Sequence, residues 1–157
     1  MRGRKVVIIL GVLPLLAVLT CWNRGKISAV TNLAFDSGNC AGCLLGADDG
    51  LSSFVVRTDA DYESLTAKCN HIREKWLPPR PGREEVLVYV SREGSGCKGC
   101  LDIVNVRETY RETIVKVEGG FQGACEMLIT HGAWALVPKT QKPVTFEFRK
   151  VLCSDDQ

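Results

Sequence analysis

The fold of this chain is decided by residues 59–76, which read DADYESLTAKCNHIREKW. Apolar side chains recur there at steps of three and four residues and form one stripe, which consists of Tyr62, Leu65, Cys69, Ile72 and Trp76. Thr58 or Asp59 can cap the N-terminus through a side-chain oxygen, and the sequence PPRPG at 78–82 cannot continue a helix. The pattern therefore predicts one amphipathic helix from about Asp59 to Trp76.

The rest of the chain reads as β-strands. Residues 144–149 read VTFEFR, which places apolar side chains on one face and polar side chains on the other. Glycines and His131 mark breaks at 94–99, 119–120 and 131–132. Further strands are expected at 30–35, 54–57, 86–91, 101–108, 113–118, 121–130 and 133–137. We expect an α+β fold in which the helix packs on a mostly antiparallel sheet.

The first 21 residues have the features of an export signal. Three cationic side chains within residues 2–5 precede an apolar run at 6–19. This run is shorter than the roughly 20 residues that a membrane-spanning helix needs. Three outcomes stay open: a lipoprotein acylated on Cys21, an uncleaved membrane anchor, or free secretion. We therefore predict that residues 1–21 direct export, with the protein anchored on the periplasmic or cell-surface face of a membrane.

The charge and the motifs of the chain after residue 20 argue against several classes of function. Removing residues 1–20 changes the balance from 20 Lys and Arg against 18 Asp and Glu to 17 against 18. This near-neutral chain has no basic face interleaved with aromatic residues, which argues against a nucleic-acid partner. Its two histidines, His71 on the predicted helix and His131 in a predicted turn, lack the Gly-x-Ser-x-Gly elbow of a hydrolase. A single non-catalytic domain at 28–153 is the simplest interpretation.

Cysteine usage is heavy, with eight cysteines in 157 residues. In an exported chain such usage indicates disulfides. Setting Cys21 aside leaves seven, so at least one cannot pair within the chain. The sequence does not select the partners among Cys40, Cys43, Cys69, Cys97, Cys100, Cys125 and Cys153.

Two cysteine groups have the same spacing, Cys40-Ala-Gly-Cys43 and Cys97-Lys-Gly-Cys100. Paired Cys-x-x-Cys turns also resemble the knuckles of a structural zinc site, so zinc held by these four thiolates is an alternative to disulfides. A thiol–disulfide oxidoreductase is a further alternative. It would place the first cysteine at a helix N-terminus, whereas Cys43 leads into a turn and Cys100 into a predicted strand. No other cofactor is expected.

The order of segments resembles the PrcB C-terminal-like family of exported bacterial proteins. The resemblance covers about residues 30–150. One departure lies at residues 96–100, which read GCKGC where the family has a Pro-Thr-Gly-Gly-Tyr-like segment. The matching segments are FDSG at 35–38, FVVR at 54–57, Tyr62 and Leu65, LVYV at 87–90, ALVPK at 135–139 and PVTF at 143–146.

This resemblance implies a non-catalytic accessory subunit that stabilises a surface or periplasmic protease complex. We therefore expect a membrane-anchored protein-binding module whose partner is another exported protein, such as a protease. The expected contact surface is the cysteine-bearing hairpin or an exposed strand edge. A protease inhibitor-like domain and a thiol–disulfide oxidoreductase are the alternatives.

Overall fold

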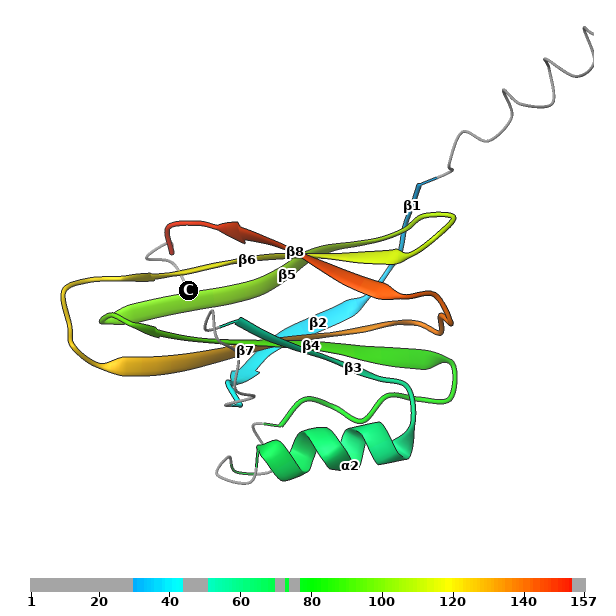
Figure 1. Cartoon of the computed structure of the whole chain (residues 1–157), viewed down its shortest axis with the longest axis horizontal. Helices are drawn as coiled ribbons and strands as arrows, with labels where there is room; N and C mark the ends of the chain where they lie inside the picture. Colours follow the sequence, from blue (N-terminus) through cyan, green and yellow to red (C-terminus); the bar gives the residue numbers. More distant parts are fainter. Residues whose placement is uncertain (1–29, 44–50, 70–72, 74–76, 154–157) are drawn as a thin grey trace, which may run out of the picture.

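The computed structural model describes residues 30–43, 51–69, 73 and 77–153 (Figure 1). The predicted signal at 1–21, with Cys21, lies outside these residues, as do His71, Ile72 and Trp76 of the predicted helix. Within the described ranges, no helix is both long and apolar enough to cross a membrane.

Two four-stranded sheets pack face to face, and one helix lies against the outer face of the second sheet (Figure 1). Sheet A contains, in spatial order, β1 (Thr31–Asn32), β5 (Lys98–Glu108), β6 (Thr113–Gln122) and β8 (Val144–Lys150). Sheet B contains, in spatial order, β2 (Asp36–Ala41), β7 (Leu128–Pro138), β4 (Glu85–Ser95) and β3 (Leu51–Val56). Neighbouring strands are antiparallel except β6 and β8, which are parallel. The predicted mixture of a helix with mostly antiparallel strands is confirmed, but the strands form two sheets.

Strand β4 is buried on both faces, which explains its unbroken apolar run. Val86, Val88 and Val90 pack into the core between the sheets, whereas Leu87 and Tyr89 face the helix. A strand covered on both sides needs no polar face. The core between the sheets is completed by Leu101, Ile103, Val106, Val115, Val117, Ala133, Ala135 and Val137. The helix-side core consists of Cys43, Val56, Leu65, Cys69, Leu87 and Tyr89.

Helix α2 (Asp59–Lys68) begins where the sequence predicts and ends earlier. Thr58 caps it: the Asp61 N–H donates to Thr58 Oγ1 at 3.1 Å, and the Thr58 N–H donates to Asp61 Oδ2 at 2.9 Å. The predicted extension to Trp76 is wrong at Cys69, which has φ −98° and ψ 20°, and at Arg73, which is not helical. The prolines at 78–81 therefore do not end this helix.

The final predicted strand is confirmed as β8, but two predicted breaks are wrong. Residues 119–120 lie inside β6 and residues 131–132 inside β7. A Cβ on Gly120 would lie 2.2 Å from the Val151 carbonyl oxygen, so this glycine allows the C-terminal segment to pass close to β6. The predicted strand at 121–130 is instead the end of β6, a connection at 123–127 and the start of β7. The predicted strand at 30–35 is replaced by the short β1 and the start of β2 at Asp36.

Candidate functional site

Two of the connections that pass from one sheet to the other meet at the left end of the molecule in Figure 1. Residues 96–97 join β4 to β5, and residues 123–127 join β6 to β7. The Gly96 N–H donates to the Met127 carbonyl at 3.1 Å, and the Cys97 N–H donates to the Gln122 carbonyl at 2.8 Å. A disulfide joins Cys97 to Cys125, with Cα atoms 4.9 Å apart. We call residues 96–97 and 123–128 the disulfide tip.

Gly123 allows the disulfide tip to close. Its φ is +89°, a conformation that side chains other than glycine rarely adopt. A Cβ at this position would also lie 2.7 Å from Cys97 Sγ. The tip is therefore shaped by a glycine, two backbone hydrogen bonds and a covalent bond.

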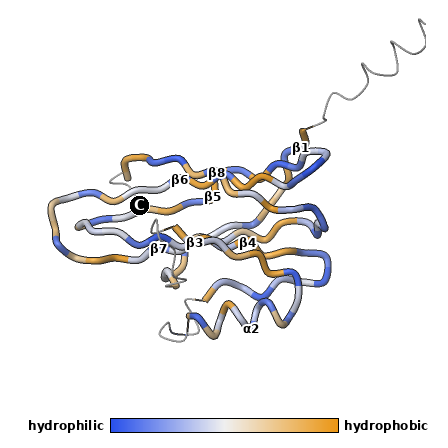
Figure 2. The backbone as a smooth tube through the Cα atoms, in the orientation of Figure 1, coloured by the Kyte–Doolittle hydropathy of each residue, from blue (hydrophilic) through white to orange (hydrophobic). Residues whose placement is uncertain are grey.

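The disulfide tip exposes two large apolar side chains. Met127 is 62% exposed and Leu128 is 67% exposed, and the hydrophobic colour continues from this connection into β7 in Figure 2. Apolar groups held in this way on a braced loop suit contact with an apolar surface of another molecule. The sequence pattern misses this feature, because it assigns both residues to a strand at 121–130. The signal in the sequence that could have revealed this connection is Gly123-Ala124-Cys125, which interrupts the predicted strand at 121–130.

A second disulfide fixes the chain at the base of the tip. Cys100 on β5 is bonded to Cys153, with Cα atoms 5.6 Å apart. The Gln122 side-chain amide donates to the Cys153 carbonyl at 3.0 Å. The segment after β8 is therefore attached to both β5 and β6.

The prediction of disulfides is confirmed for six cysteines. The third pair joins Cys43 to Cys69, with Cα atoms 4.9 Å apart, and it is buried between sheet B and the helix. Cys40, a candidate for disulfide or metal binding, has a free thiol instead. The structure does not bring together the four thiolates of the zinc alternative, and the described residues contain no group of three or more His, Cys, Asp and Glu that could hold a metal.

Cys40 is poorly suited to thiol chemistry. Burial raises the pKa of its thiol to about 12, although a hydrogen bond with Tyr89 acts in the opposite direction. A thiol with this pKa stays protonated at neutral pH, and the thiolate is the reactive form. Each Cys-x-x-Cys motif also lacks the internal disulfide that an oxidoreductase cycle needs, since Cys43, Cys97 and Cys100 pair outside their motifs.

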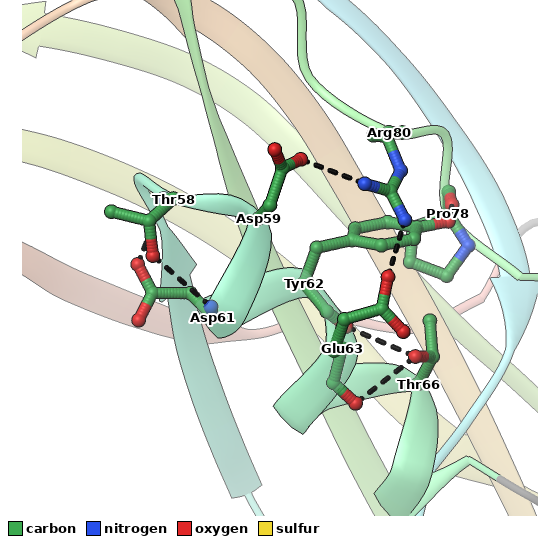
Figure 3. Close-up of polar contacts among 8 residues, drawn as sticks. All are labelled: Thr58, Asp59, Asp61, Tyr62, Glu63, Thr66, Pro78 and Arg80. Carbon is green, nitrogen blue, oxygen red and sulfur yellow. Dashed lines mark hydrogen bonds and ion pairs between the residues drawn. The ribbon is translucent and has the colours of Figure 1, made fainter.

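A polar cluster at the helix connects it to the proline segment (Figure 3). The Arg80 guanidinium contacts Asp59 Oδ1 at 2.7 Å and Glu63 Oε1 at 2.5 Å. It also lies 4.7 Å from the centre of the Tyr62 ring. The Tyr62 hydroxyl donates to the Pro78 carbonyl at 2.9 Å. These contacts attach residues 78–80 to the helix.

His131 lies inside β7 and not in the predicted turn. Its ring packs beside Phe121, with centroids 6.1 Å apart. Burial lowers the pKa of His131, although the charge of Asp102 acts in the opposite direction. His131 is therefore a neutral side chain near pH 7 that packs beside an aromatic ring.

Comparison with known proteins identifies no relative. No protein-family model matches the sequence, no curated protein matches it, and no solved structure matches the fold. The most distinctive surface feature among the described residues is the disulfide tip.

Proposed function

We propose that this chain is a non-catalytic, exported, membrane-anchored module that binds another protein through the disulfide tip. The observation that carries the proposal is the exposure of Met127 and Leu128 on a loop closed by the Cys97–Cys125 disulfide. A loop that is already ordered loses little conformational freedom on binding. Methionine is also enriched at protein interfaces because its side chain adapts to irregular pockets.

The proposed partner is an exported protein, and the segment resemblance favours a protease complex that this chain stabilises as an accessory subunit. Three disulfides suit an oxidising compartment, in which such a partner would be met. The proposed attachment to the membrane is through residues 1–21, either by a lipid on Cys21 or by an uncleaved anchor.

The test compares two variants of the full chain in its native membrane. In the tip variant, Met127→Ser and Leu128→Ser remove the exposed apolar groups. In the control, Val104→Ser changes another partly exposed side chain, on the bulge of β5. After cross-linking and extraction, we expect a specific exported partner with the wild type and with the control, but not with the tip variant. Equal recovery with both variants, or no partner with the wild type, would contradict the proposal.

A protease inhibitor is the second candidate, because a braced loop with an exposed methionine could also enter an active-site cleft. The two roles differ in a rate assay. An inhibitor lowers the initial rate of the recovered peptidase, whereas a stabilising subunit leaves that rate unchanged and lengthens the lifetime of the peptidase at elevated temperature. In both cases the tip variant should lose the effect.

A further inference from the structure

Strand β8 forms an open edge of sheet A. Among the described residues, no strand pairs with the side of β8 that faces away from β6. Two hydrogen bonds fix which backbone groups point outward: the Thr113 N–H donates to the Pro143 carbonyl at 2.9 Å, and the Val151 N–H donates to the Gly119 carbonyl at 3.1 Å. The odd-numbered residues from 143 to 151 therefore direct their backbone N–H and C=O groups toward β6. The even-numbered residues of β8, from 144 to 150, turn their N–H and C=O groups to the open side.

This edge lacks two of the features that usually prevent strand pairing, a proline and a β-bulge. Residues 144–150 contain no proline, and their register with β6 has no bulge. Two of the three charged side chains in this strand, Glu147 and Arg149, form ion pairs within the same sheet. Glu147 pairs with Arg107 at 2.9 Å, and Arg149 pairs with Glu118. The opposite side of sheet A differs, because β1 covers one end of β5 there and β5 itself carries a bulge between Ile103 and Asn105.

We propose that the β8 edge binds a second copy of this chain. The two β8 strands run antiparallel about a two-fold axis at Phe148 and join two copies of sheet A into one continuous sheet. Phe148 lies opposite Phe148 of the second copy, and its outward N–H and C=O groups form the central hydrogen bonds. This inference does not depend on the proposed function, since the β8 edge and the disulfide tip share no residue.

Charge complementarity selects this register. With the axis at Phe148, each Glu147 lies opposite Arg149 of the other copy, at a non-hydrogen-bonded position where side chains approach closely. Opposite charges at directly facing positions stabilise a strand pair. An axis at Glu147 would instead place two like carboxylates face to face, which is destabilising.

The same register covers Leu152, the most exposed large apolar side chain of the described residues. Leu152 is 86% exposed, and it lies in a segment that continues along β6 through the Val151 hydrogen bond. The Cys100–Cys153 disulfide holds the next residue in place. Continued pairing sets Leu152 opposite Val144 of the second copy, which gives this exposed side chain an apolar contact.

Sedimentation velocity of the full exported chain, with its disulfides formed and in density-matched detergent, tests the proposal. We expect a reversible dimer for the wild type. Glu147→Arg and Arg149→Glu each create two like-charge contacts across the axis and should raise the dimer dissociation constant by about tenfold or more. The double variant E147R/R149E exchanges both charges and should restore the dimer.

The double variant distinguishes an effect on the contacts between copies from an effect on ion pairs within one chain. It loses the pairs with Arg107 and Glu118 within the chain that the single variants lose, so recovery of the dimer cannot come from those pairs. A wild type that is monomeric at every soluble concentration would overturn the proposal. So would a dimer that is insensitive to the single substitutions, or a double variant that stays monomeric. The tip variant M127S/L128S should dimerise normally, so its failure to bind a partner would be distinguishable from failure of this interface.

Discussion

Two disulfides of nearly equal span occupy opposite environments in this molecule. Cys43–Cys69 spans 26 residues and is buried in the helix-side core, whereas Cys97–Cys125 spans 28 residues and closes the disulfide tip on the surface. Loop length sets how far a cross-link restricts the unfolded chain, so this contribution is nearly the same for both. The difference between them must therefore arise in the folded state.

The folded state depends on Cys43–Cys69 because the helix has few other attachments. Helix α2 has ten residues, and Leu65 is its buried residue. An isolated helix of this length is marginal in water. The disulfide ties the residue after the helix directly to the segment that follows β2. At the disulfide tip, by contrast, long strands already hold the chain, and the bond orders a surface loop.

Removal of the buried bridge should have the largest effect. We expect the variant C43A/C69A to lose about 3–5 kcal/mol in the free energy of unfolding, because it loses both the cross-link and buried sulfur contacts. Denaturant unfolding followed by circular dichroism measures the change. Hydrogen exchange should show the loss of protection concentrated in residues 59–69. A loss no greater than that of the tip disulfide variant would refute the distinction between the two bridges.

Removal of the tip bridge should have a smaller effect on stability, about 2–3 kcal/mol, because C97A/C125A leaves the packed cores intact. Its main consequence should be local. Amides of residues 123–128 should exchange faster, and affinity for the partner should fall even though Met127 and Leu128 are unchanged. Exchange measured by mass spectrometry on peptides from the tip and the helix tests this. A faster exchange of the helix than of the tip would contradict it.

Local patterns in the sequence are sufficient to predict several secondary-structure elements. The alternation of residues 144–149 predicts β8, and Thr58 predicts the helix N-terminus, since both depend on neighbouring residues alone. The cysteine count predicts disulfides but not their pairing, because Cys43 and Cys69 meet only after a strand and a helix have packed together. The continuous apolar run at 86–90 indicates a strand that is buried on both faces. In a single sheet with one helix only one face of the strand is covered, so this run indicates a second layer that the predicted fold lacks.

Other features depend on contacts between distant segments. Gly119 and Gly120 resemble a turn in the sequence, yet they lie within β6. A Cβ on Gly119 would lie 2.7 Å from the Cys100 carbonyl oxygen, and one on Gly120 would meet the C-terminal segment. A sequence read locally cannot distinguish a glycine that turns the chain from one that allows close passage of another strand. The disulfide tip was missed for the same reason, since both connections are needed to form it.

Alkaline pH should weaken the helix-side core in particular. Burial raises the pKa of Cys40 to about 12, from an ordinary value of 9.0, and also raises the pKa of Tyr89. Between pH 9 and pH 12 the Cys40 thiol has lost its proton in the unfolded protein but retains it in the folded protein. Stability is therefore unaffected by this group below pH 9 and falls as pH rises, by at most about 1.4 kcal/mol per pH unit.

The Cys40→Ala variant isolates the contribution of the thiol. Short denaturant titrations from pH 8 to pH 10 should give a shallower decline for C40A than for the wild type. Hydrogen exchange at the disulfide tip should change equally in both proteins, because neither Cys40 nor Tyr89 lies there. Parallel declines in the two proteins would show that the thiol does not titrate as its burial requires.

Loss of the helix cap should have the smallest effect. Thr58→Ala removes the side-chain oxygen that accepts from the Asp61 N–H, which should lower the free energy of unfolding by about 1 kcal/mol. Thr58→Ser keeps the hydroxyl and serves as the matched control, with a stability close to that of the wild type. Denaturant unfolding of the three proteins under one condition measures the difference.

This ranking follows from how the helix is attached. If the buried disulfide fixes the helix on sheet B, a weakened cap frays only its first turn, and the exchange of residues near Cys69 should stay slow in T58A. If T58A instead lost as much stability as C43A/C69A, formation of the helix would limit the stability of the helix-side core. The Cys43–Cys69 disulfide would then resemble the tip disulfide, because it would order a segment without stabilising the core.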